Sequence, residues 1–112
     1  MKKTDQNHCT SQSYTLHRLF LRALALYPKH SSLHLKYAGF LRHARRDIVG
    51  ADKHYELAVT TNPENSDALG SYASFLHGAI GNMEGASKYY ADAVKIDPTH
   101  TNNFCNYGLF LR

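Results

Sequence analysis

The sequence predicts an all-α protein, a right-handed α-solenoid of stacked antiparallel helix hairpins with about six helices. The pentapeptide YASFL at 72–76 recurs as YAGFL at 37–41 and as YGLFL at 107–111, always 35 residues apart. Apolar residues along the chain also follow the 3.6-residue period of helices. The three prolines, at 28, 63 and 98, are again 35 residues apart, and each ends a predicted helix. Because one hairpin cannot hide its apolar face alone, neighbouring units must stack and share a continuous core.

The size and composition are those of one globular domain. The 112 residues are 43% apolar and 20% charged, and no apolar run approaches the length of a membrane span. We therefore expect no spanning helix and no secretory signal. Cys9 and Cys105 form no disulfide framework or metal-ligand spacing, which predicts a reducing compartment. The cytoplasm is the first expectation, with an organelle or the nucleus as alternatives.

The charge is distributed unevenly along the chain. Residues 1–46 hold nine Lys or Arg and one acid (9 − 1 = +8), while residues 47–112 hold four and eight (4 − 8 = −4). Such a dipole can steer an acidic partner toward the first half, or favour head-to-tail association between copies.

The first thirteen residues are polar and are expected to be a disordered tail, 1–13. A helix is then predicted from about Ser13 to Tyr27, where Pro28 ends it because the residue before a proline leaves the helical region. One face of this helix carries the apolar residues Leu16, Leu19, Phe20, Ala23, Leu24 and Tyr27.

A second and a third helix should form the first hairpin. Ser31 or Ser32 can cap the second helix, which runs to about Arg45, and Asp47 can cap the third. The third helix is expected to bury Ala51, Tyr55, Ala58 and Val59 and to end at Asn62-Pro63.

The same pattern then begins again. Ser66 or Asp67 caps the fourth helix, Gly81-Asn82 makes the turn, and the fifth helix ends at Asp97-Pro98. Thr101 can begin a sixth helix as its cap. When residues 28–62 are aligned with 63–97 without a gap, 13 of 35 positions are identical. The chain therefore contains an internal repeat. The tyrosines and phenylalanines that recur at helical spacing are expected in the core.

These residues resemble the tetratricopeptide repeats. The pattern of that family is similar to Tyr72-Ala73-x2-Leu76 on a first helix and to Ala86-x3-Tyr90, Ala93 and Pro98 on a second. The resemblance divides a helical domain, 14–112, into a half repeat 14–28, repeats 29–63 and 64–98, and a half repeat 99–112. The units are one residue longer than the family's, and the extra residue must fall between 41 and 51 and between 76 and 86.

The resemblance implies a protein–protein interaction module, a scaffold or adaptor. In such arrays the concave face, lined mainly by first helices, holds a peptide, and here an acidic or polar segment is expected. Carried over position by position, the family's inner residues correspond to Lys36, Arg42, His43, Ser71, Ser74, His77, Asn102 and Asn106. The two-carboxylate clamp that some relatives use for chaperone tails is absent, because Leu35, Gly39, Ser71, Asn102 and Asn106 occupy its positions.

Three alternatives remain open. The 35-residue period resembles pentatricopeptide arrays, which bind single-stranded RNA, although the Asn62-Pro63 and Asp97-Pro98 joints make nucleic acid the weaker choice. Residues 1–29, with Arg18, Arg22 and Lys29 around an apolar face, could bind an anionic membrane surface. The chain could also be a self-associating structural piece of a longer array, forming a homodimer through exposed terminal helices.

Catalysis has little support in the sequence. His30 and His34 are the only histidines four residues apart that could pair on a helix, and we interpret them as surface residues. No nucleophile signature or phosphate loop occurs, so we expect no enzyme activity, no catalytic residue, no metal and no cofactor.

Overall fold

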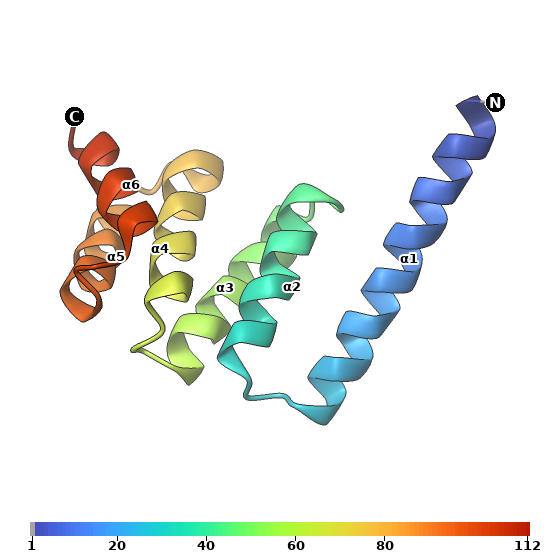
Figure 1. Cartoon of the computed structure of the whole chain (residues 1–112), viewed down its shortest axis with the longest axis horizontal. Helices are drawn as coiled ribbons and strands as arrows, with labels where there is room; N and C mark the ends of the chain where they lie inside the picture. The colour runs from blue at the N-terminus through green and yellow to red at the C-terminus, as the bar shows by residue number, and fades with distance from the viewer. Residues whose placement is uncertain (1) are drawn as a thin grey trace.

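The computed structural model describes the backbone of residues 2–112 and the side chains of residues 12–112. The described chain is helical throughout and contains no strand. Its elements are α1 (Lys2–Leu26), α2 (Ser31–His43), α3 (Ile48–Thr61), α4 (Ser66–Phe75), the π-helical turn η1 (Leu76–Ile80), α5 (Met83–Ile96) and α6 (Thr101–Leu111). The helices follow one another side by side, which gives the all-α solenoid that the sequence predicts (Figure 1).

Two antiparallel hairpins form the centre of the molecule, α2 with α3 and α4 with α5. Both close through the same turn. The Asp47 amide donates to the Leu41 carbonyl and the Asn82 amide to the Leu76 carbonyl, each at 2.8 Å, and both partners are six residues back. The bond spans one residue more than the usual Schellman bond, and like that bond it follows a left-handed residue, here Arg46 or Gly81.

The extra residue of each repeat lies inside these turns, as the sequence predicts. In the second hairpin it widens the end of α4 into the π-helical turn η1. In the first hairpin the Arg45 amide reaches the Phe40 carbonyl, five residues back, at 3.2 Å. The extra residue is therefore accommodated in the turn, and the two helices of each hairpin keep their packing register.

The helix caps lie one residue earlier than predicted, except at Asp47. His30, Asn65 and His100 are the N-caps of α2, α4 and α6, and their side chains accept the amide three residues on. Ser31 and Ser66 are instead the first helical residues. The Ser31 hydroxyl donates to the buried Ala58 carbonyl at 2.7 Å and accepts from Asn65, so it joins the two repeats rather than capping a helix.

The core alternates small and aromatic side chains, as expected. Fully buried alanines lie where helices cross, at Ala38, Ala51, Ala58, Ala68, Ala73, Ala86 and Ala93. Between them pack the buried rings of Tyr37, Tyr55, Tyr72, Phe75 and Tyr90. Phe75 is wholly buried and its ring lies 4.9 Å from that of Tyr55 on the preceding hairpin. Small residues let the backbones approach, and the rings fill the remaining space. Tyr107 and Phe110 are only partly buried.

Helix α1 takes the place of a second hairpin helix against α2. The Tyr37 hydroxyl and His17 Nε2 are 2.8 Å apart, and the Tyr72 hydroxyl donates to Asp52 at 2.9 Å. Positions 17 and 52 are one repeat apart, so the two contacts correspond.

Helix α1 is long and packs on α2 over only part of its apolar face. The helix is drawn from Lys2, and no proline or glycine precedes Pro28 to stop it. The disordered tail expected at 1–13 stays a prediction. Moreover, α1 leans away from α2 toward its N-terminal end (Figure 1). Phe20 and Leu24 pack on the core, whereas Leu16, Leu19 and Tyr27 are 45–60% exposed. The side chain of Cys9 lies outside the described residues.

His34 is a core residue rather than a surface histidine. It is 4% exposed, and its Nε2 donates to the Pro28 carbonyl at 2.7 Å. In the neutral ring this leaves Nδ1 as an acceptor, to which His54 Nδ1, 3.0 Å away, donates. The His30 ring caps α2 and does not join this pair. Within the described residues, no three His, Cys, Asp or Glu side chains gather as a metal site.

Cys105 is an exposed free thiol. In the part of the chain that the structure describes, no helix combines the length and apolar character needed to cross a membrane.

Candidate peptide-binding groove

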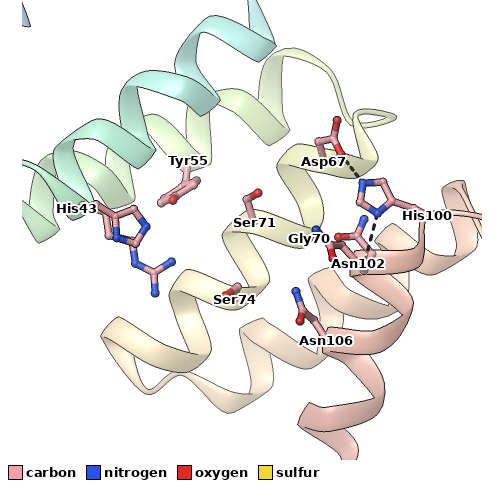
Figure 2. A pocket seen from close by; sticks show the side chains of 11 residues that line it. His43, Tyr55, Asp67, Gly70, Ser71, Ser74, His100, Asn102 and Asn106 are labelled. Atoms are coloured by element: carbon pink, nitrogen blue, oxygen red, sulfur yellow. Dashed lines mark hydrogen bonds and ion pairs between the residues drawn. The ribbon is translucent and has the colours of Figure 1, made fainter. Parts of the chain in front are cut away.

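A polar cavity of about 250 Å³ lies over α4, between α2 on one side and α6 on the other (Figure 2). Three first helices thus supply its floor and its two walls. The lining residues are Arg42, His43, Tyr55, Asp67, Gly70, Ser71, Ser74, His100, Asn102, Asn103 and Asn106.

Arg42 provides the fixed positive charge of the groove. Its side chain is half-buried, and its guanidinium carbon lies 5.5 Å from the centre of the Phe75 ring. A guanidinium over an aromatic face is held by the ring's electron density, so the charge is positioned without a carboxylate. Among residues 12–112, no Asp or Glu forms an ion pair with Arg42. A half-buried cation without an acidic partner is ready to bind an anion.

The floor consists of small residues of α4. Ser71 and Ser74 are half-buried and leave room above the helix. Burial raises the pKa of the Tyr90 hydroxyl beneath, while a hydrogen bond from Ser74 and the nearby Arg42 charge act in the opposite direction. The side chain of Ser74 is therefore linked to the core below and close to the cation beside it.

The α6 wall is neutral and rich in amides. Asn102 and Asn106, one turn apart, are exposed and face the cavity (Figure 2). Asn103 is buried instead, and its Nδ2 donates to the Ser66 carbonyl at 2.8 Å. A side chain at Gly70 would overlap the Asn103 amide, so this glycine lets α4 and α6 approach closely.

The end of the groove opposite Arg42 holds a hydrogen bond between His100 and Asp67. His100 Nδ1 accepts the Asn103 amide at 3.2 Å, so Nε2 carries the proton that is donated to Asp67 (Figure 2). The pair joins the start of α4 to the start of α6. The groove thus has an unpaired cation, Arg42, at one end, amides in the middle and the hydrogen-bonded His100 and Asp67 at the other.

Six of the eight residues predicted from the sequence line this cavity: Arg42, His43, Ser71, Ser74, Asn102 and Asn106. Lys36 does not. It lines a separate apolar cavity between α1 and α2 with Ala23 and Tyr27. His77 is exposed and lies edge-on to the Phe110 ring, 5.1 Å between centres, outside the groove lining.

Sequence reasoning missed Tyr55, Asp67 and His100. Tyr55 comes from a second helix, and only first-helix positions were considered. Asp67 and Asn102 share one repeat position, so the rule that selected Asn102 could also have found Asp67. His100 was missed because its role as a cap was given to Thr101.

Comparisons with known proteins place the chain by fold. No family model matches it. The solved structure of the first TPR of Spaghetti (RPAP3), bound to the HSP90 peptide SRMEEVD, is similar with a TM-score of 0.76 and 15% identity. The match covers 97% of this chain and 85% of that one. The chain therefore has the tetratricopeptide-repeat fold.

Shorter sequence matches come from protein adenylyltransferases Fic of insects. The Aedes aegypti protein is 52% identical over 46 residues, and the Drosophila mojavensis protein is 40% identical over 63 residues. These matches cover 41% and 56% of this chain, but only 9% and 12% of those proteins. The chain thus spans about a tenth of the length of these relatives.

Proposed function

We propose that this tetratricopeptide-repeat chain is a protein-interaction module that holds an acidic or polar peptide segment in the groove between α2 and α6, and that it acts by binding rather than by catalysis. The observation that carries the proposal is Arg42, a half-buried guanidinium that stacks on Phe75 and has no carboxylate partner among the described residues. An acidic side chain would complete it with charge-assisted hydrogen bonds.

The remaining lining suits a peptide backbone. Asn102 and Asn106 each offer an amide donor and acceptor, the pair that an extended backbone requires. Ser71 and Ser74 leave space for the chain to lie over α4. The similar RPAP3 structure is bound to a peptide with three acidic side chains, which supports an acidic ligand here too.

A titration with a labelled, carboxyl-amidated SRMEEVD peptide tests the proposal. Amidation removes the terminal charge, so the measurement reports acidic side chains alone. We expect a Kd of about 10–100 µM at low salt, weakening as salt is added, because exposed charge pairs are screened. The peptide SRMQQVN, in which amides replace the three acidic side chains, should bind at least about tenfold more weakly.

Equal affinity for the acidic peptide and its amide-substituted form, or no binding of either at millimolar concentration, would contradict the proposal. A single-stranded oligouridine is titrated in parallel. Binding of the oligonucleotide without binding of the acidic peptide would favour the RNA-binding alternative instead.

Self-association remains a prediction. Phe104, Leu109 and Leu111 of α6 are 55–64% exposed, and Leu16 and Leu19 of α1 are 45% and 56% exposed. If these surfaces pair between copies, light scattering at tens of micromolar protein should detect a dimer, and a strictly monomeric profile would remove the prediction.

A further inference from the structure

The turn of the first hairpin contains an arginine in a backbone conformation that favours glycine. Arg46 has a φ of 55° and is the one non-glycine residue with positive φ in the described chain. A Cβ in this left-handed region crowds the following carbonyl, so glycine usually occupies it. The corresponding position of the second hairpin is Gly81, with a φ of 81°.

The two turns are otherwise alike, which isolates the substitution. The amides after the left-handed residues, at Asp47 and Asn82, both donate to a carbonyl six residues back at 2.8 Å. The side chains of Asp47 and Asn82 then cap the next helix, accepting Gly50 and Gly85 amides at 2.9 and 3.0 Å. Hence the turn itself does not require arginine, and glycine would serve it better.

The side chain of Arg46 lies beside the groove. With Arg42, His43 and Ile48 it lines a second cavity, of about 490 Å³. Arg42 and His43 also line the groove over α4, so the two cavities adjoin. Like Arg42, Arg46 forms no ion pair with any described acid, and it is exposed. A residue in an unfavourable backbone conformation is a reason to look for a functional role.

We propose that Arg46 is a second anion-binding residue of the groove, which contacts a further acidic side chain of the bound segment while Ile48 contacts an apolar neighbour. This inference rests on the proposed function. It defines the ligand more closely, as a segment with two acidic side chains whose second acid extends past Arg42 toward the turn between α2 and α3. Charge complementarity favours such an occupant, because this end of the cavity holds two arginines and a histidine.

Arg46→Gly tests the proposal with two opposite effects. Removing the left-handed Cβ should raise Tm by about 2–6 °C, while losing the cation should weaken binding of amidated SRMEEVD about three- to tenfold. Arg46→Lys keeps both the charge and the backbone cost, so it should change each quantity far less. Gly81→Arg is the mirrored control. Nothing lies within 4 Å of a Cβ there, so only the left-handed φ opposes a side chain. This variant should lower Tm without weakening peptide binding.

The outcomes separate the inference from the proposed function. If wild-type protein binds the acidic peptide and Arg46→Gly binds it equally well, Arg46 is not a ligand contact and the inference fails while the groove stands. If Arg46→Gly lowers Tm, the arginine is structural and the inference also fails. If the wild type does not bind the acidic peptide, the proposed function itself is wrong. Higher Tm with weaker binding supports both.

Discussion

The first hairpin, α2 with α3, and the second, α4 with α5, share buried alanines, buried tyrosines and the hydrogen bonds of their turns, but only 13 of their 35 aligned positions are identical. His34, Arg46 and His54 of the first are replaced in the second by a leucine, a glycine and a tyrosine. The shared residues build the fold, because they are buried at helix crossings. At these three positions the first hairpin has two histidines and an arginine. We therefore expect the first hairpin to respond to pH and to bind anions more than the second.

The largest effect is expected where the second hairpin meets α6. Gly70→Ala would push a methyl group into the Asn103 amide and separate α4 from α6, at a cost of about 2–3 kcal/mol in the free energy of unfolding. Gly39→Ala is the matched control in the first hairpin, because nothing lies within 4 Å of a Cβ there, and it should be neutral or slightly stabilising. Urea unfolding measures both; equal effects would refute the close approach at Gly70.

The next largest effect is a pH dependence confined to the first hairpin. Burial, the neighbouring His34 and Lys53 lower the pKa of His54 from 6.5 to about 4, while Asp47 acts weakly in the opposite direction. Because the folded pKa lies below the unfolded one, stability is fully present above pH 6.5 and is lost as the pH falls toward 4. Partial exposure of His54 screens the effect, so we expect a loss of about 1–2 kcal/mol.

Hydrogen exchange at pH 7.5 and pH 4.5 resolves which hairpin responds. Amides of α2 and α3 should lose more protection at the lower pH than those of α4 and α5. His54→Tyr copies Tyr89 of the second hairpin and should reduce the difference. An equal loss of protection in both hairpins of the wild type would show that His54 is not responsible.

The smallest effect should come from the tyrosine hydroxyls that join each unit to the one before. Burial and the hydrogen bond to Asp52 raise the pKa of Tyr72, so this hydroxyl stays protonated as a donor. Tyr72→Phe and Tyr37→Phe should each cost about 1 kcal/mol. Urea unfolding checks this, and a loss above about 3 kcal/mol would indicate repacking rather than one lost hydrogen bond.

The repeat period explains why the fold could be predicted. Tyr37 and Tyr72 recur in register with alanines at helical spacing, and a helical period with proline stops leaves few other architectures. The position of α1 was harder to predict. Leu16 follows the same period and yet is exposed, because the face of α1 that meets α2 is the one with His17, Phe20 and Leu24.

The groove could be predicted only in part, because its lining comes from separate repeats. Arg42, Ser74 and Asn106 follow from their positions on first helices. Lys36 satisfies the same rule but lies too near α1, in another cavity. Likewise the left-handed φ of Arg46 is a property of the turn in space, and its one sign in the sequence is the alignment of Arg46 with Gly81.

A charge reversal with a matched control tests the central claim most directly. Arg42→Glu and Lys36→Glu change the net charge equally and lie on the same helix, but only Arg42 lines the groove. Titration with amidated SRMEEVD should show that Arg42→Glu weakens binding at least about thirtyfold and Lys36→Glu less than about threefold. Equal weakening by both variants would mean that the peptide is attracted by net charge and not bound in the groove. Unchanged binding by Arg42→Glu would contradict the account.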